Sequence, residues 1–300
     1  MARQKITDIL KTGKLLVSDG AWGTLLFQKG LKPGECPDEW SISHPDAVKE
    51  IAQSYIDAGA DMVETNTFGA NRFKLLHYGL QDMASEINEA AARLSCEAAG
   101  DKKYVIASIG PTGKMLLMGD VTEEALYDCF REQAVALEKG GAHAVCIETM
   151  SDADEAVQAI KAAKENTGLE VIATFTFDKT IQGAYRTMMG LSPADAIRMA
   201  LETGADIIGT NCGNGMERMI DIVKEIHTEF PEAFILVQAN AGLPVLVDGV
   251  VKFPETPEIM ASYIPALIEA GANIVGGCCG TTPKHIKAIA VALQKYIHDM

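Results

Sequence analysis

The chain has 300 residues and a formal net charge of −15 at pH 7, which disfavours nucleic acid and anionic membrane surfaces as partners. Its length allows one large barrel or two ordinary domains. The N-terminal segment has no signal-peptide core, no apolar run approaches membrane-spanning length, and the seven cysteines do not form a secreted disulfide framework; together these features predict a cytoplasmic protein.

Eight short apolar segments rich in β-branched residues recur along the chain, with helical segments between them. Near-continuous apolar runs of this kind are typical of parallel strands that helices cover from outside. In chain order, the predicted strands lie near Leu15–Asp19, Met62–Asn66, Val105–Ile109, Ala144–Glu148, Val171–Phe175, Ile207–Asn211, Ile235–Ala239 and Ala272–Val275.

Glycines and capping residues mark the helices between these strands. A helix-ending glycine precedes four of the strands, at Gly59, Gly141, Gly204 and Gly271, as expected for a tight turn from helix into strand. Helix starts are predicted by a capping threonine and by three pairs of a capping residue and a first-turn proline. These are Thr122, Ser192-Pro193, Thr256-Pro257 and Thr282-Pro283.

Eight β-α units in about 300 residues predict an α/β fold, a single-domain (β/α)8 TIM barrel over residues 1–300. A doubly wound sheet is the alternative, although no glycine-rich dinucleotide turn follows the first strand. In the barrel fold the active site lies at the C-terminal ends of the strands. The segments Trp22–Gly30 and Thr65–Arg72 are expected to form loops around the mouth of the barrel, at this end of the strands.

Two cysteine loops follow predicted strands. Cys212 lies in Asn211-Cys212-Gly213, and Cys278 and Cys279 lie in the glycine-rich segment Gly276–Gly280. Three thiolates at strand ends, with no obvious fourth ligand, suggest a zinc ion with one open position, which is typical of catalytic rather than structural zinc. The six histidines are scattered, and none is assigned to the metal. The remaining cysteines, Cys36, Cys96, Cys129 and Cys146, are interpreted as inert core residues.

With these motifs in place, the chain resembles the homocysteine S-methyltransferase family, specifically the homocysteine-binding module of the cobalamin-dependent branch. The matching sequence motifs occur in order over essentially the whole chain. They are Asp19–Thr24, Glu64–Arg72, Glu148-Thr149, Gly209–Gly213, Asn240–Pro244 and Gly276–Pro283.

The resemblance implies a homocysteine-binding barrel domain over residues 1–300, with zinc held by Cys212, Cys278 and Cys279. It also implies that the first-strand loop and Glu148 hold the amino-acid end of homocysteine. The three cysteines and Glu148 are therefore the predicted catalytic residues. Zinc ligated by thiolates lowers the pKa of a bound thiol yet leaves its sulfur electron-rich, so the sulfur can attack an electrophilic methyl group and form methionine.

Other strand-end residues are predicted to bind the substrate. Backbone N–H groups near Gly20, Ala21 and Trp22 are candidates to hold the α-carboxylate, and Glu148 is a candidate to hold the α-ammonium. The remaining predicted substrate-binding residues are Asp19, Asn66, Asn211 and Asn240. Alternatives remain open: Glu148 paired with Arg72 or Arg186, Asp19 capping the turn after the first strand, and the asparagines satisfying loop backbone or orienting ligands.

The resemblance favours a methylated corrinoid, methylcobalamin or a corrinoid protein or domain, as the methyl donor, bound outside this chain's own domain. The chain is then either an excised module or a standalone enzyme whose donor arrives on another molecule. The alternative donor is S-methylmethionine or another small sulfonium or ammonium compound. Two further functions are considered. One is a different zinc barrel enzyme, such as a hydrolase or aldolase, which the all-sulfur ligand set disfavours. The other is a non-catalytic zinc-binding barrel.

Overall fold

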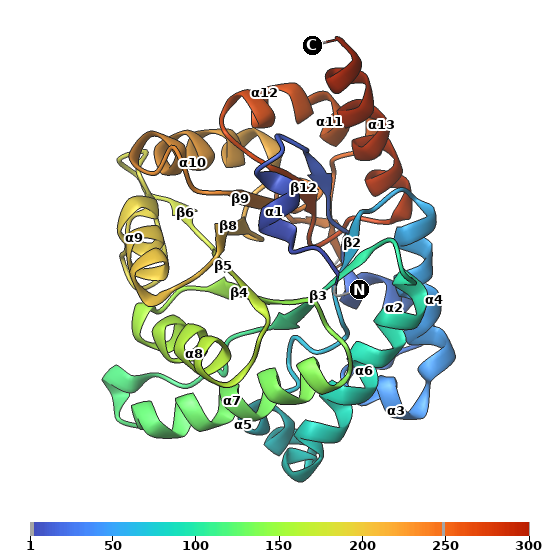
Figure 1. Cartoon of the computed structure of the whole chain (residues 1–300), viewed down its shortest axis with the longest axis vertical. Helices are drawn as coiled ribbons and strands as arrows, with labels where there is room; N and C mark the ends of the chain where they lie inside the picture. The colour runs from blue at the N-terminus through green and yellow to red at the C-terminus, as the bar shows by residue number, and fades with distance from the viewer. Residues whose placement is uncertain (1–2, 248–249, 300) are drawn as a thin grey trace.

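The computed structural model describes residues 3–247 and 250–299. Eight parallel strands form a nearly closed barrel inside a ring of helices (Figure 1). The strands are β1 (Leu16–Val17), β2 (Met62–Val63), β3 (Tyr104–Ile109), β4 (Ala144–Met150), β5 (Glu170–Phe175), β8 (Ile207–Asn211), β9 (Ile235–Ala239) and β12 (Ile274–Gly277). Their spatial order, β1-β12-β9-β8-β5-β4-β3-β2, follows the chain around the barrel. A doubly wound sheet reverses its strand order partway, so the predicted (β/α)8 fold is confirmed.

Asp61 closes the barrel where the first two strands meet. Its backbone N–H donates to Val17 O at 2.7 Å, and its side chain accepts the Val17 N–H at 3.1 Å. On its other side β1 pairs in register with β12, Leu16 opposite Ile274. The side chain of Asp61 therefore takes the place of a longer ladder between two short strands.

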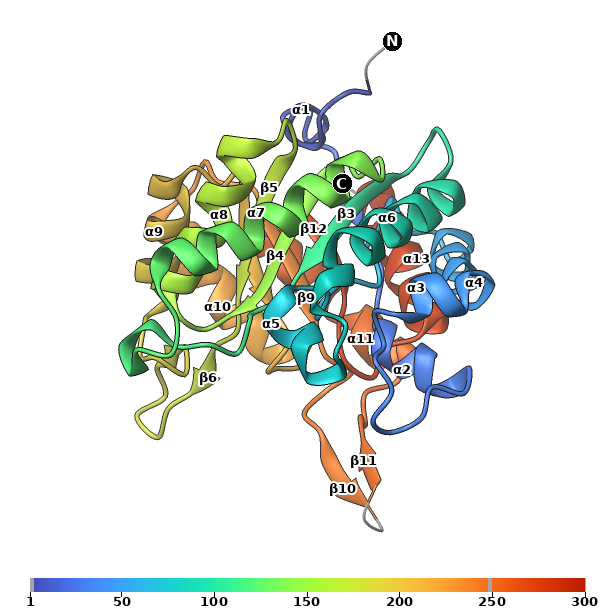
Figure 2. The same ribbon diagram turned by 90° about the horizontal axis from the view of Figure 1, so that it is seen from below.

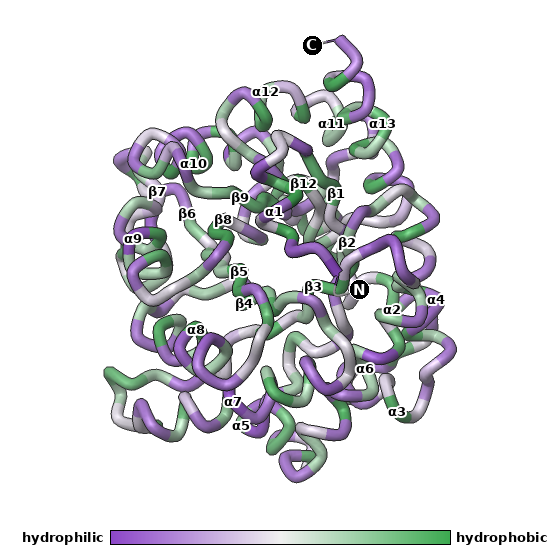
Figure 3. The backbone as a smooth tube through the Cα atoms, viewed as in Figure 1, coloured by the Kyte–Doolittle hydropathy of each residue, from purple (hydrophilic) through white to green (hydrophobic). Residues whose placement is uncertain are grey.

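The helices form an outer layer around the strands, and several short ones lie in the connections. They are α1 (Ile6–Leu10), α2 (Trp22–Gln28), α3 (Trp40–Ser43), α4 (Pro45–Asp57), α5 (Arg72–Leu75), α6 (Ala84–Ala99), α7 (Glu123–Lys139), α8 (Ala153–Asn166), α9 (Pro193–Thr203), α10 (Met216–Glu229), α11 (Pro257–Ser262), α12 (Ile264–Glu269) and α13 (Pro283–Asp299). Along these helices hydrophilic and hydrophobic residues alternate (Figure 3), as expected when one face packs on a barrel. No helix in the described residues is long and apolar enough to cross a membrane.

The predicted helix starts are confirmed. Thr122, Ser192 and Thr256 each accept a hydrogen bond from a first-turn backbone N–H, and α13 begins at Pro283. The four predicted glycine turns all have φ between 100° and 117°, a region that favours glycine because it has no Cβ. One expectation is wrong: Trp22–Gln28 is helix α2 rather than loop, with its N-terminus at the barrel mouth.

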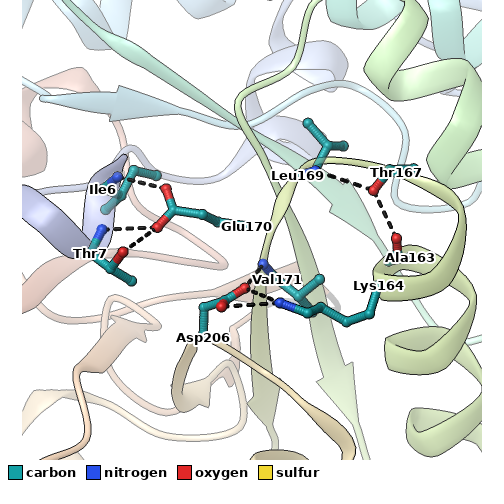
Figure 4. Close-up of polar contacts among 9 residues, drawn as sticks. All are labelled: Ile6, Thr7, Ala163, Lys164, Thr167, Leu169, Glu170, Val171 and Asp206. Carbon is teal, nitrogen blue, oxygen red and sulfur yellow. Dashed lines mark hydrogen bonds and ion pairs between the residues drawn. The ribbon is translucent and has the colours of Figure 1, made fainter. Parts of the chain in front are cut away.

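The short helix α1 covers the N-terminal end of the barrel (Figures 1 and 2). Ile6 and Leu10 belong to the same buried cluster as the barrel residues Leu16 and Met62. Glu170 fastens the helix: its carboxylate accepts the backbone N–H groups of Ile6 and Thr7 and the Thr7 hydroxyl, at 2.6, 3.0 and 2.6 Å (Figure 4). One end of the barrel is thereby sealed, which leaves the C-terminal end as the open one.

Two β-hairpins extend from that C-terminal end. β6 (Asp178–Lys179) pairs with β7 (Tyr185–Arg186) after β5, and β10 (Val245–Val247) pairs with β11 (Val250–Lys252) after β9. Figure 2 shows α1 at one end of the barrel and both hairpins at the other. The predicted site residues lie at the end that carries the hairpins.

Candidate functional site

A cavity of about 370 Å³ opens at the C-terminal ends of the strands. Its lining includes all three loop cysteines together with Glu64 and Glu148. A larger groove of about 860 Å³ lies between α11 and α13 on the outside of the barrel. It contains none of the strand-end residues. The smaller cavity is therefore the candidate site.

Three sulfur atoms converge in this cavity. Cys212 follows β8, and Cys278 and Cys279 follow β12, the second strand along the barrel wall from β8. Their Sγ atoms lie within 4.8 Å of one another, and those of Cys212 and Cys279 are 3.9 Å apart. No other group of three candidate metal ligands occurs among residues 3–247 and 250–299. Contacts with the Cys278 and Cys279 thiols lower the pKa of Cys212 to about 3, so one thiolate is already favoured.

The sulfur spacing fits tetrahedral zinc. A Zn–S bond of about 2.3 Å gives an S···S separation of about 3.8 Å in a tetrahedron, and the observed Cys212–Cys279 distance is 3.9 Å. Cys212 has φ of +57°, a strained value for a residue with a Cβ. The strained backbone places its sulfur beside the other two, and three sulfurs leave the fourth tetrahedral position for another ligand.

Glu148 is a buried carboxylate in the same cavity. Burial raises its pKa to about 7, although the Ser108 hydroxyl donates a hydrogen bond to it. The alternative ion pair is not found, since Arg72 binds Glu132 at 2.9 Å and Arg186 donates to the backbone oxygen of Tyr185. An unpaired carboxylate in a pocket is a ready partner for a cation.

Asp19 is fully buried. Its carboxylate accepts hydrogen bonds from the Trp22 indole at 2.9 Å and the Glu64 backbone N–H at 2.8 Å. Burial raises its pKa to about 7. The side chain joins the first-strand loop to the segment directly after β2, as the turn-capping alternative expects.

The first-strand loop reaches the cavity through Gly20, Ala21 and Trp22, which all line it. The Ala21 N–H already donates to the Thr281 hydroxyl at 3.0 Å. A Cβ on Gly20 would lie 2.6 Å from the same hydroxyl oxygen, so the loop needs glycine to approach this closely.

The three predicted asparagines differ in their partners. Asn66 donates to Pro37 O at 2.7 Å and so holds the loop before α3. Asn211 is completely buried, and its side-chain amide is hydrogen-bonded to Glu148, Thr149 and Thr174. Asn240 has a buried Oδ1 without a hydrogen-bond partner. Asn66 and Asn211 therefore position other groups, as the alternative reading expects.

Glu64 and Gln238 line the cavity and were not among the predicted site residues. The Gln238 amide donates to Glu64 at 2.9 Å, and burial, followed by repulsion from Glu148 and Asp19, raises the pKa of Glu64 well above its ordinary value. Glu64 begins the sequence motif Glu64–Arg72 at the end of a predicted strand, so its position already indicated a role in the site. Gln238 was signalled only by being a polar residue within an apolar strand.

Comparison with known proteins bears on what this cavity does. The family model described as homocysteine S-methyltransferase matches residues 16–293. Methionine synthases from Mycobacterium leprae and Mycobacterium tuberculosis are 32% and 34% identical to the chain over 309 and 310 residues, covering 96% of it. The chain spans 25% of the length of each of these two proteins.

Solved structures show the same fold. The homocysteine methyltransferase MmuM from Escherichia coli, in its metallated form, has a TM-score of 0.78 and 21% identity, with 95% of this chain and 98% of that chain covered. A methyltransferase from Methanosarcina mazei has a TM-score of 0.61 and 12% identity, with coverages of 95% and 94%.

Proposed function

Because the chain belongs to the homocysteine S-methyltransferase family, we propose that its cavity binds homocysteine beside a zinc ion held by Cys212, Cys278 and Cys279 and that a methyl group is transferred to the substrate sulfur. The carbon–sulfur bond of methionine forms as the bond from the methyl group to its donor breaks. The thiol proton is released to solvent. The observation that carries this proposal is the convergence of three sulfurs and a buried, unpaired carboxylate in one cavity.

Zinc bound at this site would lower the pKa of the substrate thiol, so that the sulfur reacts as a thiolate at neutral pH. Three thiolates leave the metal site with a net charge of about −1 by simple counting. Such a site withdraws less charge from the substrate sulfur than a histidine site would. The all-sulfur set therefore favours thiol alkylation over the hydrolase alternative.

The chain's own residues orient the substrate. Glu148, held by Ser108 and Asn211, accepts the α-ammonium, and this cation brings the pKa of Glu148 back down. The pKa of Glu64 is raised well above its ordinary value, so Glu148 rather than Glu64 is the carboxylate assigned to the ammonium. The free backbone N–H groups of the first-strand loop and of the start of α2 donate hydrogen bonds to the α-carboxylate. Since Thr281 uses the Ala21 N–H, its neighbours Gly20 and Trp22 are the better candidates.

We propose a methylated corrinoid, carried by another protein or domain, as the methyl donor, in agreement with the similarity to methionine synthases. S-Methylmethionine remains the alternative donor. The absence of nucleic acid and membrane partners and the cytoplasmic location stay predictions from the sequence.

The test is a donor panel with homocysteine, measuring methionine production. Methylcobalamin, a methylated corrinoid protein, S-methylmethionine, betaine and S-adenosylmethionine are supplied separately to the zinc-loaded protein and to the chelated protein. We expect methionine from the corrinoid donors only, and only with zinc. Faster turnover with S-methylmethionine would replace the donor assignment, whereas zinc-independent or absent turnover with all donors would contradict the proposed function.

A further inference from the structure

The β10–β11 hairpin stands free of the barrel and exposes apolar side chains. Val245 and Leu246 are successive residues of β10, so they point to opposite faces of the hairpin. Both are exposed, as is Val251 on β11, and Leu246 is 73% exposed. Neither face of the hairpin is therefore covered by the barrel (Figure 2). An isolated two-stranded hairpin is only marginally stable in water, and exposed apolar side chains on it are more typical of a contact surface.

Exposed apolar residues gather at the same end of the molecule. Sixteen large apolar side chains are exposed in the described parts of the chain, and four of them lie on outer helices: Val135, Ile259, Val291 and Ile297. The other twelve all lie in segments between the C-terminal end of a barrel strand and the barrel helix that follows. The most exposed of these are Leu117, Met118, Ile181, Met188 and Leu246. The apolar surface thus surrounds the open mouth of the barrel.

The hairpin is anchored directly to the cysteine loop. At its base, the Ala241 N–H donates to Cys279 O at 2.9 Å, and the Glu255 N–H donates to Ala241 O at 2.9 Å. Directly after β11, the Phe253 ring packs so closely on Gly280 that a Cβ there would lie 2.2 Å from a ring carbon. A partner that contacts the hairpin is therefore brought next to the three sulfurs.

We propose that this apolar rim, with the β10–β11 hairpin as its main arm, is a docking surface for the protein that carries the methyl donor. The inference rests on the proposed function and deepens it. A cavity of about 370 Å³ is at the small end of the range for ligand pockets and also has to admit homocysteine. A macrocyclic donor such as a corrinoid must then be presented from outside, by a protein that covers the mouth.

A second copy of this chain fits the surface less well. It would cover the opening through which the methyl group has to arrive, and each copy carries a net charge of −15, which opposes self-association. A donor-carrying protein covers the same opening only while it delivers its methyl group.

Binding is the direct test and does not depend on turnover. The full chain is titrated with a corrinoid protein loaded with methylcobalamin, and the dissociation constant is compared for the unsubstituted chain, the double variant Leu246→Glu/Val251→Glu and the double control Val291→Glu/Ile297→Glu. Val291 is 58% exposed and Ile297 49%, compared with 59% for Val251 and 73% for Leu246, so the control adds the same two charges at exposed apolar residues of the outer helix α13. We expect at least about a tenfold weaker complex for the double variant, equivalent to the loss of one interface hot spot, and no change for the control.

Turnover separates this inference from the proposed function. The double variant should keep its zinc content, its homocysteine affinity and its rate with free methylcobalamin, while its KM for the corrinoid protein rises at least about tenfold. Failure of the unsubstituted chain to bind the corrinoid protein, or equal binding by the double variant, refutes the docking surface. A dimer in solution that Leu246→Glu dissociates would reassign the surface to self-association. Lack of methionine from either donor counts against the proposed function instead.

Discussion

The Asn211 side chain is expected to be the most sensitive polar group of the site. Its Oδ1 accepts the Thr149 N–H and the Thr174 hydroxyl, both at 2.8 Å, and its Nδ2 donates to Glu148 at 3.1 Å and to the Thr149 hydroxyl at 2.7 Å. It also holds Thr149 at a φ of +60°, a conformation that costs of order 1 kcal/mol or more. Asn211→Ala removes all four hydrogen bonds at once.

The magnitude follows from the number of groups left without a partner. Each lost hydrogen bond costs about 1 kcal/mol, and a buried group left unsatisfied costs about 1–3 kcal/mol. We therefore expect the free energy of unfolding to fall by about 4 kcal/mol. Because Glu148 keeps only the Ser108 hydroxyl and a long 3.4 Å hydrogen bond from the Thr149 hydroxyl as positioning partners, homocysteine affinity should fall about tenfold, or about 1.4 kcal/mol. Zinc content should not change, since the cysteine side chains are intact.

The assays are urea denaturation and calorimetric titration with homocysteine. The matched control is Asn66→Ala, because Asn66 is a strand-end asparagine that makes one strong side-chain hydrogen bond, to Pro37 O at 2.7 Å. We expect the control to lose about 1 kcal/mol and to bind homocysteine normally. Equal destabilisation by the two substitutions, or unchanged homocysteine affinity in Asn211→Ala, would refute this reasoning.

Four further predictions concern the metal, the substrate and the ends of the barrel. Alanine at Cys212, Cys278 or Cys279 should abolish stoichiometric zinc while Cys96→Ala retains one zinc per chain; metal analysis that finds full zinc in Cys279→Ala would exclude the three-ligand site. Glu148→Gln should weaken homocysteine binding about tenfold or more with zinc retained. Since burial raises the pKa of Glu148 to about 7, it is neutral below that pH and charged above it, so affinity for the ammonium should rise between pH 6 and 8 and rise less in Glu148→Gln. Burial likewise raises the pKa of Asp38 from 3.8 to about 6, so the folded state holds that proton longer than the unfolded state and stability is lost as pH rises from about 4 to about 6. A shift of about two units corresponds to about 3 kcal/mol, and Asp38→Asn should flatten this part of the urea-midpoint profile; identical profiles would argue against a protonated Asp38. Glu170→Gln should lower unfolding free energy by about 2 kcal/mol and speed amide exchange at Ile6 and Thr7 (Figure 4), without changing zinc content at the opposite end.

Local sequence patterns predicted the architecture and the convergence of the three loop cysteines. Strands, helix caps and glycine turns depend on residues a few positions apart, and such local patterns can be read directly. The eight strands lie where the apolar runs predicted them, and Thr122, Ser192 and Thr256 cap their helices. Because every strand of a (β/α)8 barrel ends at the same mouth, strand positions alone predicted that Cys212, Cys278 and Cys279 would converge.

Contacts between residues far apart in the sequence determine which polar groups at the mouth are left free for a substrate. Asn211 and Glu148 are 63 residues apart, and Gln238 and Glu64 are 174 apart; no local pattern relates such partners. Asn66, Asn211 and Asp19 were candidates for substrate binding, yet their side chains are occupied by loop backbone and neighbouring residues. A strand-end position brings a polar side chain to the mouth, but packing across the barrel determines whether its donors and acceptors are already used. The exposed hairpin and the helix at Trp22–Gln28 likewise depend on what the rest of the fold covers.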